Sequence, residues 1–527
     1  MFTRWSAMFP AAVALLAQTA PQPASVSGTV TDSVSGEPIS RAHVILRCNS
    51  QDRPQEQHSY GALTNEKGAF SITQIPPGKC SVETERVGFV SPRRSTNLAL
   101  SNGTRKEDLK LTLTATGAII GRVLNAAGEP MQGVDVSAEL TIANPSGSVT
   151  DDKGRYRIGG LRPGMYRVKA TPNSEPFPPE IRSDGSVEQM DAITYYPDSM
   201  DRKTAQRLEV KAGAEVCGVQ IKLAQTPVVK VSGKVTGVPP GKQDLSVMAQ
   251  SLFGQGHWAT LKPDGTFVIW RLVPGKYTLQ ATYFGQSELV SSPVEIELST
   301  GNLEHVDLSV APPFEIAGQL RFDDDQAREA PKPSTKPAGT SPPTPPQPRR
   351  LQIYKLGHTP GSSTTTVADD DTFTMEKVQP GRYSVLVLGI SGYVKSVRIG
   401  DKDTAGDILD VRSGAPGPVT VTLSSDRCEI SGTVSDSNGP LTGAMVGLVE
   451  AERQSGGWMN RSQIRFAHLD SAGTYKFRVP PGTYRLAAVD GDVNDGNFTG
   501  ADLEDYEPET IELSAGDKVT KDLLRHK

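Results

Sequence analysis

The sequence predicts an all-β protein built from five tandem antiparallel β-sandwich domains. The chain has 527 residues, which is more than one hydrophobic core usually serves. Short stretches of alternating apolar and polar residues recur between turn signals, and long helical periodicity is absent. Glycine (51) and proline (40) are numerous, as a chain of many short strands and turns requires. A third observation, a hairpin pattern that occurs five times, sets the number of domains.

The hairpin pattern is G-x-[FY]-x-[IMF], an apolar residue, and then P-G-x-[YC]-x-[LV]. Its five copies begin at Gly68, Gly154, Gly265, Asp371 and Gly473. The first position and the Pro-Gly glycine lie ten residues apart in four copies and nine in the last. We expect the alternating aromatic and aliphatic residues to face a core and the Pro-Gly glycine to take the positive φ of a type II turn. The tyrosine that follows would fill the core and tie down a loop through its hydroxyl, so the hairpin is a packing device.

A strand with a central glycine precedes each hairpin. These glycines are Gly28, Gly121, Gly233, Gly318 and Gly432. A glycine inside a strand indicates a bulge or a close approach of another backbone. The repeat starts lie roughly 85 to 115 residues apart, which is the size of a domain and not of a solenoid unit. The predicted domains are 23–115, 116–226, 227–312, 313–425 and 426–527.

Two insertions interrupt the repeats. Residues 171–210 lie inside the second repeat and contain the sequence TYYPD, which could present Tyr195 and Tyr196 to solvent. Residues 323–350 lie inside the fourth repeat and are rich in proline and poor in apolar side chains. That composition predicts a disordered or partly polyproline II segment.

The N-terminal residues 1–22 have the features of a secretory signal peptide. Arg4 precedes a short apolar stretch, and the small residues Ala17 and Ala20 follow it, although no strict A-x-A cleavage site is present. We therefore expect export to the periplasm, the cell surface or the medium. No later stretch is long and apolar enough to predict a membrane-spanning helix. The net charge of −5 and the pI of about 5.9 give no basic footprint for nucleic acid.

Two of the four cysteines fall in the first repeat. Cys80 takes the place that tyrosine holds in the other four hairpins, and Cys48 and Cys80 both share the inward phase of their strands. An exported chain permits a disulfide between them, and two buried free thiols are the alternative. Cys217 and Cys428 stand alone in different repeats, and we expect them to be inert core residues.

The first two repeats carry a family resemblance. The segments SGTVTDSVSGEPISRAHVIL, TNEKGAFSITQIPPGKCSV, IGRVLNAAGEPMQGVDVSAEL and TDDKGRYRIGGLRPGMYRV resemble the carboxypeptidase regulatory-like domain, a transthyretin-like β-sandwich often grouped with the starch-binding-like fold. The likeness extends over all five repeats and is weaker in the fourth, where Asp371 replaces the turn glycine. It implies an accessory or scaffold domain at or outside the cell surface, usually without catalysis. Some relatives bind carbohydrate, and others accompany peptidases or outer-membrane transporters.

Motifs for catalysis are missing from the sequence. The seven histidines are scattered and none forms H-x-x-E or H-E-x-x-H, and there is no G-x-S-x-G, Walker A or Rossmann fingerprint. The acidic clusters at 150–154, 323–325 and 368–372 could offer oxygen ligands to calcium, but the same residues are favoured in tight turns, and we interpret them as turns. We predict no catalytic residue, no cofactor and no metal.

The predicted function is therefore that of a non-enzymatic, exported scaffold or interaction protein of the cell envelope. The alternative is a carbohydrate-binding protein that uses exposed aromatic side chains. The candidates for that role are Trp258, Trp270, Tyr195 and Tyr196. Trp270 could instead cover the outer face of a sheet. The expected partner is a polysaccharide or another envelope protein, no nucleic acid is expected, and the sequence does not indicate an oligomeric state.

Overall fold

The computed structural model confirms the all-β prediction. It describes residues 22–50, 57–92, 96–141, 145–173, 183, 188–238, 245–251, 256–283, 289–329, 348–356, 361–437, 439–441, 444–451, 464–489 and 498–525. The predicted signal peptide, apart from its last residue, and residues 330–347 of the proline-rich insertion lie outside these ranges. The chain divides into two compact units, of which the first holds residues up to Ala118 with 159–164 and 209–216, and the second holds the remainder.

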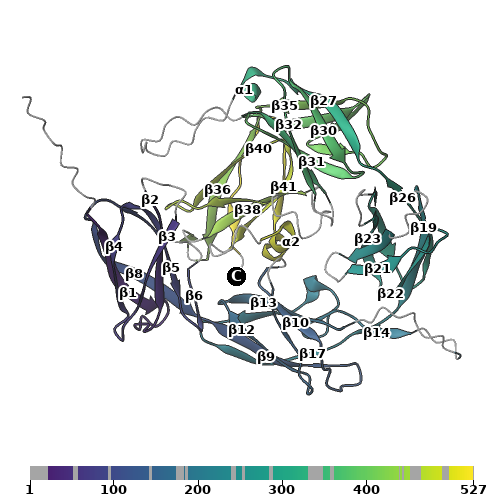
Figure 1. Cartoon of the computed structure of the whole chain (residues 1–527). Helices are drawn as coiled ribbons and strands as arrows, with labels where there is room; N and C mark the ends of the chain where they lie inside the picture. Colours follow the sequence, from purple (N-terminus) through teal and green to yellow (C-terminus); the bar gives the residue numbers. More distant parts are fainter. Residues whose placement is uncertain are drawn as a thin grey trace, which may run out of the picture. The chain divides into compact units, whose positions relative to one another are not determined.

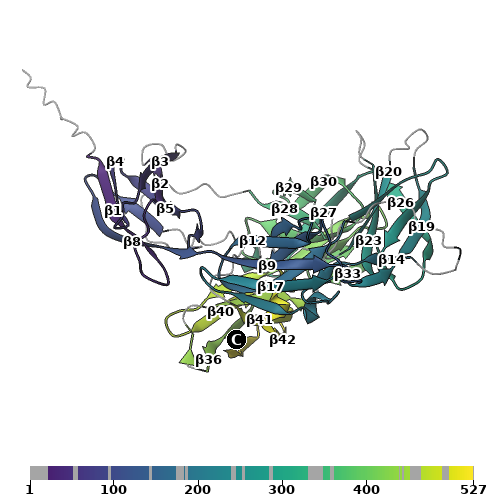
Figure 2. The same ribbon diagram turned by 90° about the horizontal axis from the view of Figure 1, so that it is seen from below.

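The first unit contains the first sandwich, whose two sheets lie face to face (Figures 1 and 2). Its sheets have the strand orders β4-β1-β8-β6 and β3-β2-β5-β7. The strands are β1 (Ala24–Asp32), β2 (His43–Ser50), β3 (Gln57–Leu63), β4 (Ala69–Ile75), β5 (Gly78–Glu85), β6 (Phe89–Val90), β7 (Thr96–Leu100) and β8 (Arg105–Ala115).

The second and third repeats follow in the same way. The second has the sheets β12-β9-β17 and β11-β10-β13-β15 and a ribbon, β14-β18, and the third has one curved sheet of order β21-β20-β23-β24-β26-β19-β22. The second repeat comprises β9 (Gly117–Leu124), β10 (Asp135–Glu139), β11 (Ser146–Val149), β12 (Arg155–Leu161), β13 (Gly164–Thr171), β14 (Gln189–Asp191), β15 (Thr194–Tyr195), η1 (Arg202–Thr204), β16 (Arg207–Val210), β17 (Glu215–Lys222) and β18 (Gln225–Pro227). The third comprises β19 (Val229–Thr236), β20 (Leu245–Ser251), β21 (Gly256–Thr260), β22 (Thr266–Leu272), β23 (Gly275–Tyr283), β24 (Val290–Ser291), β25 (Val294–Leu298) and β26 (Leu303–Ala311).

The fourth and fifth repeats, like the first, each contain a pair of sheets. Their orders are β30-β27-β35-β32-β33 with β29-β28-β31-β34, and β37-β36-β40 with β39-β38-β41-β42. The fourth comprises β27 (Phe314–Phe322), α1 (Asp325–Arg328), β28 (Arg350–Lys355), β29 (Ser362–Thr366), β30 (Thr372–Val378), β31 (Arg382–Leu388), β32 (Tyr393–Ile399), β33 (Lys402–Ala405), β34 (Ile408–Asp410) and β35 (Val419–Ser424). The fifth comprises β36 (Cys428–Asp436), β37 (Gly439–Pro440), β38 (Met445–Glu450), β39 (Arg465–His468), β40 (Thr474–Val479), β41 (Gly482–Val489), α2 (Gly500–Leu503), η4 (Glu504–Tyr506), β42 (Glu509–Leu513), β43 (Lys518–Thr520) and β44 (Leu523–Leu524).

The glycine in each first strand is required by a close backbone approach, which is one of the two alternatives that the sequence indicates. The first strand lies between the hairpin, with which it pairs antiparallel, and the last strand of the repeat, with which it pairs parallel in the first, third, fourth and fifth repeats. A Cβ atom at any of the five glycines would collide with a carbonyl oxygen of that last strand or of its immediate flank. The colliding carbonyls belong to Leu109, Val219, Val306, Val419 and Lys521. The parallel pairs are a feature that the expectation of antiparallel sheets did not include.

The hairpin aromatics complete this contact. Tyr156 donates a hydrogen bond from its hydroxyl to the Val219 carbonyl at 2.9 Å, and Tyr475 donates to the Lys521 carbonyl at 2.6 Å. These are the carbonyls that Gly121 and Gly432 approach. The aromatic, the glycine and the last strand therefore form one packing unit in the core of each of these two repeats.

The difference in hairpin spacing is explained by a β-bulge. In the first repeat Ala24 pairs with Ile75 and Val26 with Ile72, so one extra residue lies on β4, and Gln74 in this bulge has a φ of 61°. The third and fourth repeats have the same register shift. In the fifth repeat, which is one residue shorter here, β36 and β40 pair without a shift. The one additional residue of the longer hairpins is therefore the residue in the β-bulge.

The backbone of the Pro-Gly turn differs from the predicted type II turn, whereas the tyrosine after it holds a loop through its hydroxyl, as predicted. Positive φ near 70° lies at the first hairpin position, Asp371 included (67°), and Gly275 has a φ of 150°, far from the value of a type II turn. The type II prediction is therefore wrong. The hydroxyls of Tyr277, Tyr383 and Tyr484 each donate to the carbonyl four residues earlier, at 2.7 to 3.0 Å. Burial raises the pKa of Tyr277 and of Tyr383 to about 12.

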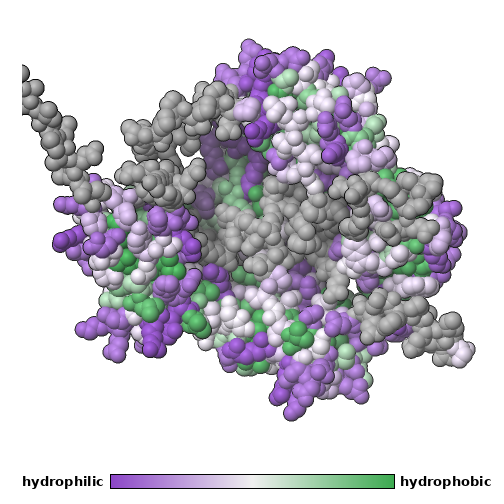
Figure 3. Space-filling model, viewed as in Figure 1, coloured by the Kyte–Doolittle hydropathy of each residue, from purple (hydrophilic) through white to green (hydrophobic). Residues whose placement is uncertain are grey.

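The helical content is small. The helices of the described ranges have three or four residues, and none could cross a lipid bilayer. On the face shown in Figure 3, hydrophilic residues predominate at the periphery of the described parts, with hydrophobic residues scattered between them. Each sandwich buries its own apolar side chains, such as Phe267 and Ile269 in the third.

Candidate functional site

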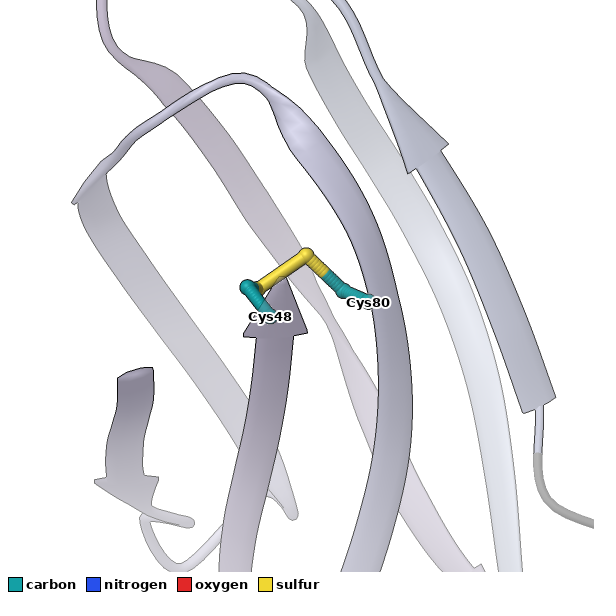
Figure 4. Close-up of a disulfide and its surroundings, with 2 residues drawn as sticks. All are labelled: Cys48 and Cys80. Atoms are coloured by element: carbon teal, nitrogen blue, oxygen red, sulfur yellow. A yellow bond between two sulfur atoms is a disulfide. The ribbon is translucent and has the colours of Figure 1, made fainter. Parts of the chain in front are cut away.

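The first sandwich is stapled by a disulfide. Cys48 on β2 and Cys80 on β5 are directly opposite in register, both are buried, and a disulfide joins them (Figure 4). It occupies the position at which the third, fourth and fifth repeats use a tyrosine bonded to its turn. Cys428 is buried, as expected, but Cys217 is exposed, so the expectation of a core residue is wrong there, because Cys217 lies on the solvent side of β17.

The two candidate tryptophans lie on different strands of the third sandwich. Trp258 is on the edge strand β21, opposite Met248, and 54% of its surface is exposed. Trp270 is on β22, at the other end of the strand order, and is half-buried. The Lys230 ammonium lies 5.9 Å from the Trp270 ring centroid, which is a cation–π distance. Lys230 therefore partly covers Trp270, and Trp258 is the more exposed of the two tryptophans.

The expectation of solvent-exposed tyrosines in the second repeat is wrong for Tyr195. Tyr195 lies on β15, which pairs with β13, and only 2% of its surface is exposed. Its hydroxyl is buried and has no hydrogen-bond partner among the described residues. Burial, with Glu139 as a second cause, raises its pKa. Tyr196 is half-buried, so neither ring offers an open platform.

A buried ion cluster lies beside Tyr195 in the second unit. Arg202 of η1 binds both carboxylate oxygens of Asp505 at 3.2 Å, and Arg167 on β13 contacts the same carboxylate at 2.5 Å. Glu139 of β10 contacts Arg202 at 3.4 Å and Lys169 at 2.9 Å, and Asp502 lies 3.6 Å from Arg202. The side chains of Arg167, Arg202 and Asp505 are only 8%, 6% and 11% exposed.

The charges of this cluster balance. Three cations (Arg167, Lys169 and Arg202) face three carboxylates (Glu139, Asp502 and Asp505). Burial acts to lower the pKa of Arg202, but Asp505, Asp502 and Glu139 outweigh it and the net shift is upward. The cluster joins the insertion of the second repeat to the α2–η4 segment of the fifth. Its charges are balanced within the chain, which is the arrangement of a structural contact, although the buried Arg167 Nε has no hydrogen-bond partner among the described residues.

A second polar region forms a cleft of about 850 Å³ between strands of the fourth and fifth repeats. Its lining includes Tyr354, Tyr393, Tyr484, Arg427 and Arg465. Tyr393 is the first residue of β32, Arg427 immediately precedes β36, and Arg465 is the first residue of β39. Strand ends of two sandwiches therefore supply the cleft, and the repeat pattern does not predict it.

Arg427 is the unusual member of this cleft. Its guanidinium lies over the Tyr393 ring, with Cζ 5.5 Å from the centroid, and one nitrogen, Nη2, donates to the carbonyls of Ser391 and Gly392 at 3.4 and 3.2 Å. Among the described residues no carboxylate is within 4 Å of the guanidinium of Arg427 or Arg465. Burial, followed by the charge of Arg465, lowers the pKa of Arg427.

The same cleft also offers acceptors. Its acidic lining residues are Asp403, Asp407, Asp426 and Glu450. Asp403 pairs with Arg398 at 3.0 Å, and Asp407 accepts a hydrogen bond from the Ser384 hydroxyl at 2.6 Å. The lining therefore mixes guanidinium donors, carboxylate acceptors and tyrosine rings.

The turn that holds Arg427 depends on the first residues of the proline-rich insertion. Asp324 caps α1 by accepting from the Ala327 amide at 2.8 Å, and Ala327 is fully buried. The amides of Ser391 and Gly392 donate to the carbonyls of Glu329 and Ala327. The prediction of disorder from residue 323 is therefore wrong for 323–329, because an N-capped turn buries its alanine. The aspartates before Gln326 were the available sequence signal.

Several known proteins are similar to all or part of this chain. A TonB-dependent transporter, Oar of Myxococcus xanthus, is 26% identical over 152 residues, a match that covers 27% of this chain and 14% of the transporter. The Bacillus anthracis TIE protein matches with 11% identity, 95% coverage of this chain, 72% coverage of that chain and a TM-score of 0.16. A streptococcal ancillary pilin matches with 14% identity, 55% coverage of this chain, 100% of its own and a TM-score of 0.21.

The family model gives the sharper result. The model described as "Carboxypeptidase regulatory-like domain" matches residues 25–114 and 118–180. These ranges contain β1 to β8 of the first sandwich and β9 to β13 of the second. They also contain the glycine strand, the bulged hairpin and the turn described above. Two segments of this chain, residues 25–114 and 118–180, are therefore similar to the carboxypeptidase regulatory-like domain family.

Proposed function

We propose that the chain is an exported, non-enzymatic scaffold or interaction protein of the cell envelope. The observation that carries this proposal is the repetition itself: the glycine-strand and hairpin unit recurs five times, and its polar atoms are used for packing. The Cys48–Cys80 disulfide supports an oxidising compartment, because such bonds are rare in the cytosol. The similarity to a segment of a TonB-dependent transporter supports an envelope setting.

The test is a fractionation of cells that express the full chain, combined with alkylation of free thiols. We expect the protein in an envelope or extracellular fraction, with Cys48 and Cys80 protected from alkylation until a reductant is added. Cross-linking in intact cells should then recover another envelope protein. A chain that remains in the cytoplasm with both thiols reactive would contradict the proposal.

A second candidate function is carbohydrate binding through exposed aromatics, and the 54% exposure of Trp258 favours it. Titration with a panel of polysaccharides and peptidoglycan, followed by tryptophan fluorescence, tests this directly. Saturable binding that Trp258→Ala removes, and that Trp270→Ala reduces less, would support it. Binding that neither substitution changes would exclude the tryptophans as its site.

A further inference from the structure

The cleft lined by Arg427, Arg465 and three tyrosines is a site that the scaffold proposal leaves without a role. Arginine is almost never fully buried without a partner, because removing its charge from water costs free energy that a counter-charge or hydrogen bonds must offset. Arg427 is half-buried and has no carboxylate within 4 Å among the described residues. Hydrogen bonds to two backbone carbonyls and the contact with the face of the Tyr393 ring offset part of this desolvation cost for Arg427. Both carbonyl contacts use Nη2, and the guanidinium has further N–H groups on Nε and Nη1.

The chemistry of the remaining donors points to an oxyanion. A guanidinium presents its N–H groups as a planar fork that matches the two oxygens of a carboxylate. Arg427 is held in place on one edge by Ser391 and Gly392 and on one face by Tyr393, so it loses little freedom when a ligand binds. Arg465 lines the same cleft and adds a second positive charge, and the third cation of the lining, Lys395, is paired with Asp323.

The acidic residues that line the cleft limit which class of ligand could carry that oxyanion. Asp403, Asp407, Asp426 and Glu450 line the same space, and an ionised carboxylate has about four acceptor positions, so each can accept hydrogen bonds in addition to those it already makes. Together their charges would repel a polyanion that brings no hydrogen-bond donors. An acidic peptide brings a carboxylate on each side chain, and its donors are confined to the backbone N–H groups and the terminal amine. A uronic acid polymer brings one carboxylate and several hydroxyl donors on each ring, and its apolar ring faces can lie against Tyr354 and Tyr393, which are half-buried, whereas Tyr484 belongs to the core. A neutral sugar would leave the arginines without an acceptor.

We propose that this cleft binds an acidic oligosaccharide, with a uronate carboxylate on Arg427 and Arg465 and sugar hydroxyls on the acidic lining residues. The proposal goes beyond the scaffold role, and it is independent of Trp258 and Trp270. The ordered turn at residues 324–329 contributes indirectly, because it positions the carbonyls of Ser391 and Gly392 that orient Arg427.

The test is calorimetric titration of the mature chain with three probes: trigalacturonate, a neutral galactose trisaccharide and a triglutamate peptide. We expect saturable binding of trigalacturonate only. Arg427→Gln should weaken it at least about 10-fold, and Arg427→Lys should weaken it less, because lysine keeps the charge but loses the fork. Arg412→Gln is the matched control, since Arg412 pairs with Asp410 on the surface of the fourth sandwich and does not line the cleft; it should change binding less than about twofold.

Each other outcome overturns the proposal. If trigalacturonate does not bind, the proposed ligand is wrong. If the neutral sugar binds equally well, the carboxylate does not contribute to recognition. Binding of triglutamate with the same dependence on Arg427 would replace the sugar by a peptide. If Arg427→Gln lowers the thermal unfolding temperature, Arg465→Gln decides the matter, because within the described ranges the Arg465 side chain makes a single hydrogen bond, at 3.3 Å to the Arg478 carbonyl. The fractionation experiment above does not depend on any of these results.

Discussion

The second unit contains two groups of arginines that have opposite surroundings. Arg167 and Arg202 face the carboxylates of Asp505, Asp502 and Glu139, and the charges cancel within the cluster. Arg427 and Arg465 line an open cleft and have no carboxylate within ion-pair distance among the described residues. The comparison separates two uses of one residue type: the first group closes a contact within the chain, and the second leaves donors for a ligand.

The electrostatics of the two groups agree with this division. Asp505 and its neighbours raise the pKa of Arg202 in spite of its burial. Burial and Arg465 lower the pKa of Arg427. A cation that its surroundings stabilise is part of the fold, whereas a cation that its surroundings destabilise indicates a site where an anion would be bound favourably.

The largest expected effect comes from removing the shared carboxylate of the first group. Asp505→Asn leaves Arg167 and Arg202 buried with less than their full counter-charge, which typically costs about 3 kcal/mol. Amide hydrogen exchange across residues 498–506 measures the local opening free energy and should report that loss.

The control for this variant is Asp410→Asn. Asp410 forms an exposed pair with Arg412, where screening by solvent keeps the loss below about 1 kcal/mol. Equal losses in the two variants would show that the cluster does not hold the fifth repeat to the second.

Salt should affect the two groups differently. The screening length falls from about 10 Å at 0.1 M to about 3 Å at 1 M salt, and buried pairs are screened much less than open ones. Raising NaCl over this range should weaken trigalacturonate binding about 10-fold and leave exchange protection at 498–506 nearly unchanged. Binding that is insensitive to salt would mean that the arginines do not contact the carboxylate.

The sandwich cores could be predicted from sequence because each depends on local patterns. Alternation within the hairpin places Phe267 and Ile269 inward, and the first-strand glycine marks a backbone contact that a Cβ would block. The ten-residue spacing was visible, but its meaning required the register of two paired strands, which shows the extra residue as a bulge. Asp371 illustrates the limit: it replaces a glycine and still adopts a φ of 67°.

The cleft and the ion cluster could not be predicted in the same way. Arg167 and Asp505 are 338 residues apart, and the cleft joins strand ends of two repeats. No periodicity in the sequence relates such residues, because the contact depends on how separate sandwiches pack. The same reason explains Tyr195, whose place in the TYYPD segment of an insertion suggested exposure although β15 pairs with β13 and buries it.

A third variant gives the cleft arginine a carboxylate partner of the kind that the buried cluster has. Arg465→Glu would place a carboxylate in the cleft with Arg427, in the way that Asp505 serves Arg202. Trigalacturonate binding should then fall at least about 10-fold, because the site acquires its own anion, and the stability of the fifth sandwich should rise by up to about 1 kcal/mol. Arg465→Gln separates loss of the cation from gain of the anion and should weaken binding less than Arg465→Glu.

The smallest expected effect is on the stability of Arg427→Gln. This change removes two long hydrogen bonds and the contact with Tyr393, and it also removes a charge that burial and Arg465 disfavour. These contributions have opposite signs, so the free energy of unfolding should change by less than about 1 kcal/mol. Arg202→Gln, by contrast, strips the bidentate partner from Asp505 and should cost about 3 kcal/mol. Urea unfolding of both variants, followed by circular dichroism, measures the difference. A similar cost for both would mean that Arg427 is kept for folding, and the donors left in the cleft would then need no ligand to explain them.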